Sequence, residues 1–218
     1  MNRAFYSDSI ADFLAKEADE ILGVLTRHSD FAVEQTQRDA WLEEIRILHS
    51  ALSSCHGSVY FEYSIPRMGR RIDVVLLIGH AVFVLEFKVG EQDFALHALE
   101  QVVDYALDLK NFHETSHRCL IAPILIASSA TNCQLVLEAI PHKDGLLLPI
   151  KTNGQLLGTA IESVLRCTGC DDRPSPMGIW AILSHADHHR SRASALQRPF
   201  RCRHLAQRCE RHQSDPNV

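Results

Sequence analysis

Two strongly apolar segments, 71–78 and 81–89, are separated by only two residues. Both are rich in β-branched and aromatic residues, and so short a connection suits a β-hairpin, so they are predicted to be paired strands. Three charged residues nevertheless lie inside them, Asp73 in the first strand and Glu86 and Lys88 in the second. An unpaired charge is costly to bury, so these side chains need partners or a metal ion.

The geometry of a hairpin brings the three charged side chains together. Strand side chains alternate between faces, so Glu86 and Lys88 share one face. A turn near Gly79 places Asp73 opposite Glu86, where two bare carboxylates repel unless a cation lies between them. Both carboxylates and the backbone carbonyl of Phe87 are hard oxygen ligands of the kind that Mg²⁺ accepts, with water and phosphate oxygens completing the shell. This pattern predicts a site for metal-assisted phosphodiester hydrolysis. The alternative is a structural ion pair on a half-exposed hairpin.

The remaining periodicity predicts an α/β sandwich. Around the hairpin, the sequence indicates helices over 7–28 and 33–52, the second closed by Gly57, then a strand over 58–66, a helix over 94–112, a strand over 119–128, a less certain strand over 145–150 and a helix over 155–165. The order is that of neither a repeat protein nor a regular doubly wound sheet.

The residues of the hairpin resemble a known family. Gly69, "RIDVVL" around Asp73 and "VLEFKVG" around Glu86 and Lys88 resemble the PD-(D/E)XK nuclease superfamily. "QVVDY" in the following helix resembles the Gln-x-x-x-Tyr element of its RecB-like branch. This resemblance implies a restriction-endonuclease-like sandwich, with a mixed central sheet and an αβββαβ core flanked by helices. That order is also the one read from residues 33–128. The residue before Asp73 is Ile72 and not the Pro of the family name.

The resemblance also implies roles for individual residues. Asp73 and Glu86 would hold Mg²⁺ or Mn²⁺. Lys88 would orient the attacking water or help to deprotonate it, and would offset charge on the scissile phosphate. Gln101 and Tyr105, four residues apart on one helical face, would position the nucleophile or the nucleic-acid backbone. Taken alone, this last pair could be ordinary helix surface.

Three further residues, Glu44, Arg70 and Arg71, are weaker candidates. Glu44, on the first core helix, is a possible extra metal ligand, although a solvated helix charge is the simpler interpretation. Arg70 and Arg71 are candidates for phosphate contacts. His97 is expected to be a surface residue.

Within the superfamily, the chain most resembles the N-terminal nuclease-like domain of bacterial proteins whose second half is a Schlafen-group-3-like P-loop helicase. We expect a helical extension over 1–32, a nuclease-like domain over 33–165 and an irregular Arg/His-rich tail over 166–218. The helicase domain expected in full-length relatives is absent from this sequence. No Gly-x-x-x-x-Gly-Lys-Ser/Thr motif occurs, so no nucleoside triphosphate chemistry is expected.

The tail is expected to be out of frame and disordered. After residue 170 it holds eight Arg, five His and no Lys, and its apolar periodicity is lost. Reverse translation of 178–218 in the next frame gives a segment that resembles the linker before a Walker A motif, which suggests a frameshift near 165–177. A zinc module is the alternative, but its second half lacks a paired spacing, so no zinc is expected; its ligands would be Cys167, Cys170, Cys202, His204, Cys209 and His212.

Composition limits the class of protein. Residues 1–170 hold 14 Lys and Arg against 22 Asp and Glu, whereas 171–218 hold 8 against 5, so a nucleic-acid partner must bind through a local patch or a cation. Seven scattered cysteines, no long apolar run and no secretion signal predict a cytoplasmic protein with reduced thiols and no membrane partner. The leading hypothesis is a metal-dependent nuclease that hydrolyses DNA, with RNA less favoured. The alternatives are a non-catalytic nucleic-acid- or protein-binding module of the same fold and a non-functional truncated gene product.

Overall fold

The computed structural model describes residues 3–29, 34–65, 69–112, 119–131, 133, 135–136 and 145–168. Along the chain the elements are β1 (Tyr6–Ser9), α1 (Ile10–Ala15), α2 (Ala18–His28), α3 (Gln35–Ala51), β2 (Gly57–Ser64), β3 (Arg71–Ile78), β4 (Ala81–Lys88), α4 (Leu96–Phe112), β5 (Leu120–Ala127), β6 (Ile150–Thr152) and α5 (Leu157–Thr168). The order from α3 to β5 is αβββαβ, as the sequence predicts.

The strands form one mixed sheet in the order β1-β2-β3-β4-β5-β6. Strands β1 to β4 pair with one another in antiparallel fashion, whereas the pairs β4–β5 and β5–β6 are parallel. The parallel step from β4 to β5 runs through helix α4, because a parallel connection needs a crossover. The predicted α/β sandwich with a mixed central sheet is therefore confirmed, and the arrangement is consistent with a restriction-endonuclease-like fold.

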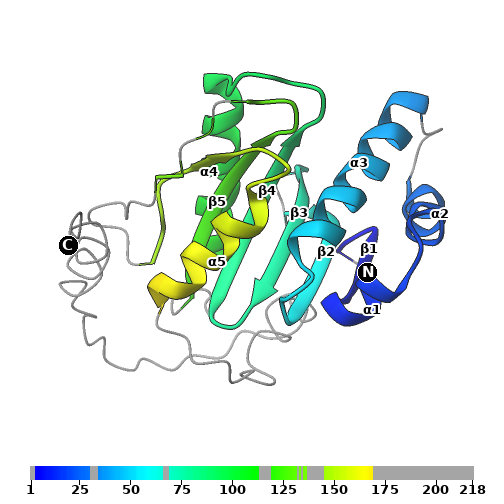
Figure 1. Cartoon of the computed structure of the whole chain (residues 1–218), viewed down its shortest axis with the longest axis horizontal. Coiled ribbons are helices and arrows are strands. Elements are labelled where there is room, and N and C mark those ends of the chain that lie inside the picture. The colour runs from blue at the N-terminus through cyan, green and yellow to red at the C-terminus, as the bar shows by residue number, and fades with distance from the viewer. Residues whose placement is uncertain are drawn as a thin grey trace, which may run out of the picture.

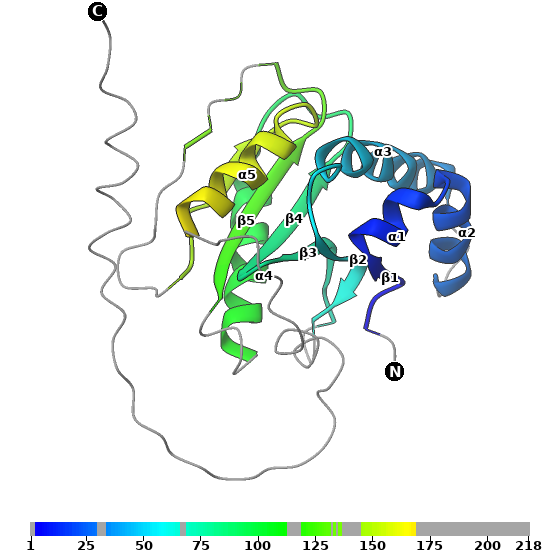
Figure 2. The ribbon, with the colours of Figure 1, turned by 60° about the horizontal axis from the view of Figure 1, so that its bottom comes forward.

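Helices cover both faces of the sheet, with α5 and α4 on opposite sides (Figures 1 and 2). On one face, strand residues such as Phe61 and Phe83 pack in a core that also holds residues of α1, α2, α3 and α5. On the other face, Val75 and Val84 pack in a second core with residues of α4. Alternation of side chains along each strand separates the two cores, and β4 is apolar on both faces because both are covered.

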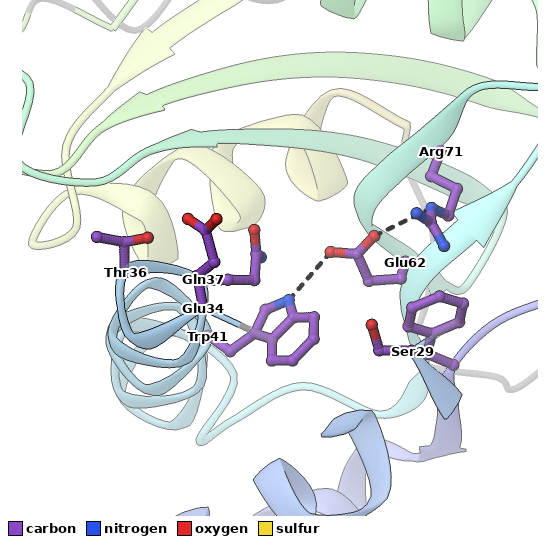
Figure 3. Close-up of a pocket in the computed structure, with 8 residues that line it drawn as sticks. Ser29, Glu34, Thr36, Gln37, Trp41, Glu62 and Arg71 are labelled. Carbon is purple, nitrogen blue, oxygen red and sulfur yellow. Dashed lines mark hydrogen bonds and ion pairs between the residues drawn. The ribbon is translucent and has the colours of Figure 1, made fainter. Parts of the chain in front are cut away.

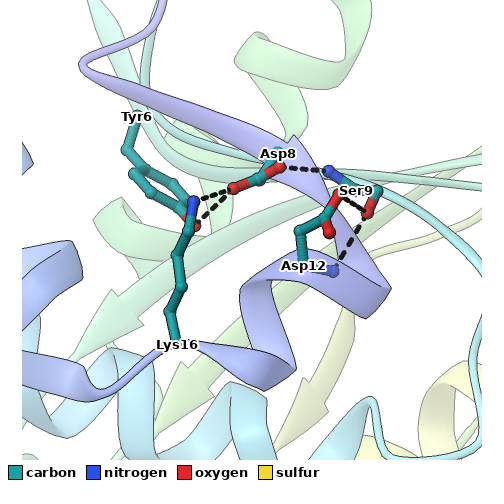
Figure 4. Close-up of polar contacts among 5 residues, drawn as sticks. All are labelled: Tyr6, Asp8, Ser9, Asp12 and Lys16. Atoms are coloured by element: carbon teal, nitrogen blue, oxygen red, sulfur yellow. Dashed lines mark hydrogen bonds and ion pairs between the residues drawn. The ribbon is translucent and has the colours of Figure 1, made fainter.

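The N-terminal segment differs from the prediction of one helix over 7–28. Residues Tyr6–Ser9 form the edge strand β1, and the helical part is broken at Lys16 and Glu17, both extended. Ser9 caps α1 by accepting a hydrogen bond from the Asp12 backbone N–H at 3.0 Å, and the Lys16 ammonium returns to Asp8 (Figure 4). A straight helix of that length would extend about 33 Å. The break instead folds both short helices onto one core.

The sequence suggested that Gly57 closes the first core helix, but the structure shows otherwise. Helix α3 ends at Ala51 with Leu52 as its C-cap, and Gly57 is the first residue of β2. A Cβ atom at position 57 would lie 1.9 Å from the backbone oxygen of Leu77 on the neighbouring strand. The position requires glycine because two backbones approach closely there.

The C-terminal part of the fold contains a shorter β-strand than the sequence predicts. Within the predicted strand 145–150, Leu146 forms an isolated bridge to Ile121, and regular pairing is limited to β6. Helix α5 extends to Thr168, past the predicted domain boundary at 165. The predicted tail from 169 onward lies outside the described residues, and the domain boundaries stay a prediction. Across the described ranges, no helix is long and apolar enough to cross a membrane.

Candidate active site

Asp73 lies where the β3–β4 hairpin stops pairing. The register runs from Ile78 opposite Ala81 to Val74 opposite Leu85, so the next facing positions are those of Asp73 and Glu86. Asp73 Oδ2 accepts a hydrogen bond from the backbone N–H of Phe87 at 2.8 Å. The carboxylate therefore takes the place of a backbone acceptor and is fixed against β4. This arrangement confirms the predicted register.

Glu86 and Lys88 form a short ion pair on β4. The Lys88 Nζ lies 2.8 Å from Glu86 Oε1, and the side chains are 30% and 3% exposed respectively. The second oxygen, Glu86 Oε2, is buried and has no hydrogen-bond partner among the described residues. The adjacent carboxyl of Asp73 can hydrogen bond to it only when one of the two carries a proton. One buried carboxylate oxygen is therefore left without a donor.

Glu44 approaches the same site from helix α3. It is 5% exposed, so the interpretation as a solvated helix charge is wrong. Together with Asp73, Glu86 and Lys88 it lines a hollow of about 280 Å³, completed by Gln37, Ala40, Phe87, Val89 and Glu91. Four carboxyl groups, those of Glu44, Asp73, Glu86 and Glu91, thus share one recess with a single lysine.

Burial, together with nearby negative charge, raises the pKa of Glu44, Asp73 and Glu86. Burial raises the pKa of Glu44 well above its ordinary value, and the charges of Asp73, Glu62 and Glu86 add to it. Burial and then the charge of Glu86 raise the pKa of Asp73 well above its usual range, against the hydrogen bond from Phe87. Burial also raises the pKa of Glu86, although its hydrogen bond to Lys88 opposes the rise. The site therefore favours the protonated form of these carboxyls in the absence of a cation.

The single lysine keeps its proton. Burial acts to lower the pKa of Lys88, but the hydrogen bond and charge of Glu86 outweigh it, so the pKa is raised. At neutral pH the side chain is an ammonium that donates hydrogen bonds. It cannot accept a proton in that state.

Helix α4 brings Gln101 and Tyr105 to the carboxylates. The Gln101 side-chain amide donates to the Tyr105 hydroxyl at 2.9 Å, and Tyr105 is only 5% exposed. Burial raises the pKa of Tyr105, and the nearby charges of Glu86 and Asp73 contribute to the rise. The two residues therefore act as one hydrogen-bonded unit beside the acids and are not ordinary helix surface.

The two candidate arginines lie at the margin of the site. Arg70 pairs loosely with Asp104 on α4 at 3.8 Å, and Arg71 pairs with Glu62 at 3.5 Å. Both side chains are more than a third exposed, so their guanidinium groups are accessible. Their contact with phosphate stays a prediction. His97 is exposed, as expected.

The acids suit a hard divalent cation. Mg²⁺ needs only one or two protein carboxylates when water and phosphate supply the other ligands. Asp73 and Glu86, with the orphaned Glu86 Oε2, provide such a pair. Within the described ranges, no group of three or more His, Cys, Asp or Glu side chains is arranged to hold a metal ion. Of the alternative zinc ligands, Cys167 lies in the last turn of α5, and the other five lie outside the described residues.

Sequence reasoning missed Glu62. This residue of β2 has φ 50°, the left-handed region that non-glycine residues seldom adopt. It accepts a hydrogen bond from Trp41 Nε1 at 3.0 Å, and its charge acts on Glu44, Asp73 and Glu86. The sequence feature that could have pointed to Glu62 is a carboxylate in an otherwise apolar and aromatic strand, "SVYFEYS".

Comparisons with known proteins give little further information. No protein-family model matches the chain, and no curated protein matches it. Among solved structures, the chain is similar to the crystal structure of a repair endonuclease from Pyrococcus abyssi. The match has 26% sequence identity and a TM-score of 0.30, and covers 48% of this chain and 42% of the endonuclease. Because that TM-score is low, the functional proposal depends on the site itself.

Proposed function

We propose that this protein is a metal-dependent nuclease that hydrolyses phosphodiester bonds, with DNA favoured over RNA as substrate. The observation that carries the proposal is the cluster at the end of the hairpin: Asp73 and Glu86 side by side, with Lys88 bound to Glu86 and one buried carboxylate oxygen left without a donor. A structural ion pair accounts for one carboxylate and the lysine. It does not account for the further acids that share their recess.

The proposed cation site consists of Asp73, Glu86 and the Phe87 carbonyl, with Glu44 as a weaker fourth ligand. A bound Mg²⁺ or Mn²⁺ would polarise a phosphate oxygen and lower the pKa of a water molecule. The acids hold the negative charge that such an ion requires. Burial and then the charges of neighbouring acids raise their pKa values, and a bound cation would stabilise the ionised carboxylates against both effects, which supports this assignment.

Lys88 acts as a cationic hydrogen-bond donor in this proposal. The side chain is protonated at neutral pH and partly exposed, so it can donate to a phosphate oxygen or orient the attacking water. Of the roles implied by the family resemblance, these are the ones that its protonation state supports. In the hydrolysis, a water oxygen forms a bond to phosphorus and the bond to the leaving ester oxygen breaks.

Gln101 and Tyr105 are proposed as positioning residues. Their mutual hydrogen bond fixes the Tyr105 hydroxyl on the α4 side of the carboxylates. This geometry supports membership of the RecB-like branch of the PD-(D/E)XK superfamily. The closer resemblance to nuclease-helicase proteins stays a prediction, because its distinguishing segment lies outside the described residues.

Nuclease assays with matched variants test the proposal. The full chain is incubated with supercoiled plasmid, labelled single-stranded DNA and labelled RNA, each in Mg²⁺, Mn²⁺ or EDTA. We expect metal-dependent cleavage that falls by about 100-fold or more in Lys88→Ala and Asp73→Asn. Lys151→Ala, an exposed lysine on β6, is the control and should retain full activity. Cleavage that survives both substitutions, or none in any metal by folded protein, would overturn the proposal and favour a binding module.

A further inference from the structure

A second hollow adjoins the candidate active site. Its volume is about 240 Å³, and its lining residues are Phe5, Ser29, Glu34, Thr36, Gln37, Trp41, Glu62 and Arg71 (Figure 3). Gln37 lines both hollows. On α3, Trp41 lines the second hollow and Glu44 the first, and three residues of helix rise by only about 4.5 Å. The two hollows are therefore close enough for neighbouring groups of one bound polymer to reach both.

The charge of the hollow selects against phosphate. Two carboxylates, Glu34 and Glu62, line it with one guanidinium, that of Arg71. Arg71 is already paired with Glu62 at 3.5 Å, and its guanidinium carbon lies 4.5 Å from the centre of the Phe5 ring. A neutral group with N–H donors fits this lining better than an anion does. The volume is also smaller than that of a usual pocket for a drug-sized ligand, which indicates a small group.

Glu62 is held so that it can accept further hydrogen bonds. Its Oε1 accepts from Trp41 Nε1 at 3.0 Å, and its Oε2 faces Arg71 (Figure 3). A carboxylate can accept about four hydrogen bonds, so acceptor capacity remains. The residue sustains φ 50° within a strand, and backbone strain of this kind persists where the surrounding structure imposes it, often at functional sites. Glu34, the N-cap residue of α3, makes no capping hydrogen bond with its side chain and lines the same hollow.

We infer that this hollow binds one unpaired nucleobase next to the scissile phosphate, and that it prefers a base with an exocyclic amino group, such as cytosine. The carboxylates of Glu62 and Glu34 accept hydrogen bonds from the amino group, the pairing that acidic side chains make with cytosine N4. The Arg71 guanidinium offers a planar cation on which the base stacks. Thymine has no amino group and is disfavoured. A paired base cannot enter, so the strand must be single or locally unpaired.

This inference rests on the proposed function for its substrate, but it has a separate readout. The chain has two tryptophans, Trp41 and Trp180. In a full chain carrying Trp180→Phe, the fluorescence of Trp41 therefore reports directly on the hollow. The probes are deoxycytidine, thymidine, single-stranded decamers of dC and of dT, and the dC decamer annealed to its complement. Titrations are run in EDTA to prevent cleavage and repeated with Ca²⁺.

We expect the single-stranded dC decamer to change the Trp41 fluorescence and to bind about tenfold more tightly than the dT decamer, the effect of about one charge-assisted hydrogen bond. Glu62→Gln should remove this preference. Glu34→Gln should weaken it and serves as the second variant should Glu62→Gln fail to fold. The control is Glu43→Gln, an acid of α3 that pairs with Arg46 and does not line the hollow, and it should leave the preference unchanged.

The outcomes separate this inference from the nuclease proposal. Equal binding of dC and dT decamers, unchanged preference in both variants, or an equal response to duplex would overturn the base-binding inference even if the protein cleaves DNA. A dC preference that depends on Glu62 or Glu34 would support it even if no cleavage is found, and deoxycytidine should then outcompete thymidine. In that case the nuclease proposal alone would fail.

Discussion

Removal of the Lys88 ammonium should destabilise the protein through Glu86. Lys88→Met keeps an unbranched side chain but deletes the group that lies 2.8 Å from Glu86 Oε1. Breaking a fully buried ion pair costs about 3–5 kcal/mol. Lys88 is 30% exposed and Glu86 can take up a proton instead, so we expect a smaller cost of about 2 kcal/mol at pH 7. For a domain of this size, that cost lowers Tm by about 4–8 °C.

The cost should depend on pH in a defined direction. Burial raises the pKa of Glu86 above its ordinary value of 4.5, and Lys88 limits the rise. Without Lys88, the pKa in the folded state rises further. A carboxyl with a raised pKa contributes stability below its unfolded value, and this contribution is lost as pH increases through the folded value. The deficit of Lys88→Met relative to wild type should therefore be absent or reversed near pH 4 and should grow toward pH 7.

Thermal melts followed by circular dichroism between pH 4 and pH 8, in EDTA, measure this effect. A double-mutant cycle with Glu86→Gln isolates the pairwise energy, because the double variant lacks both charges. Lys151→Met is the control for loss of a surface lysine on the same sheet. A deficit equal at pH 4 and pH 7, or a coupling energy below about 0.5 kcal/mol, would refute the reasoning.

Three further predictions follow from the same structure. Mg²⁺ at ten times its dissociation constant should stabilise the wild type by about 1.4 kcal/mol, or about 3–6 °C in a thermal melt, and a shift of the same size in Asp73→Asn would argue against the assigned ligand. Glu44→Gln removes a carboxyl whose pKa is raised by burial, so in EDTA the variant should equal wild type near pH 4 and exceed it at pH 7.5 in urea unfolding; equal stability at both pH values would contradict this. Gly57→Ala should cost about 2–3 kcal/mol because its Cβ would meet the oxygen of Leu77, whereas Gly23→Ala in α2, with nothing within 4 Å, should gain about 0.5–1 kcal/mol; a neutral result at 57 would exclude the close approach.

The hairpin could be predicted in detail because its information is local. Two apolar strands with a short connection allow few registers, and a slip of one residue would turn every side chain to the other face. The facing positions of Asp73 and Glu86 follow from that constraint alone. The Gln101–Tyr105 contact follows from helical periodicity in the same way.

The rest of the site depends on packing between distant segments. Glu44 lies beside the apolar stripe of α3, and only the placement of that helix over the open end of the hairpin decides that it is buried. The left-handed backbone at Glu62 carries no sequence signal, since propensity disfavours it. The break after α1 was missed because Ile10 and Ile21 fit one helical stripe equally well, and only the shared core selects the folded-back arrangement. Tertiary packing determines these features and overrides the local conformational preference of the sequence.

The six strands lie in the sheet in the same order as along the chain. The connections from β2 to β3 and from β3 to β4 are short, so these three strands can pair with little chain entropy lost in closing a loop. The carboxylates of Asp73 and Glu86 belong to one hairpin, so we expect them to meet before the distant helix α3 packs over them. Their repulsion should then hinder the earliest steps of folding, and a low pH or a divalent cation should accelerate refolding as well as stabilise the finished protein.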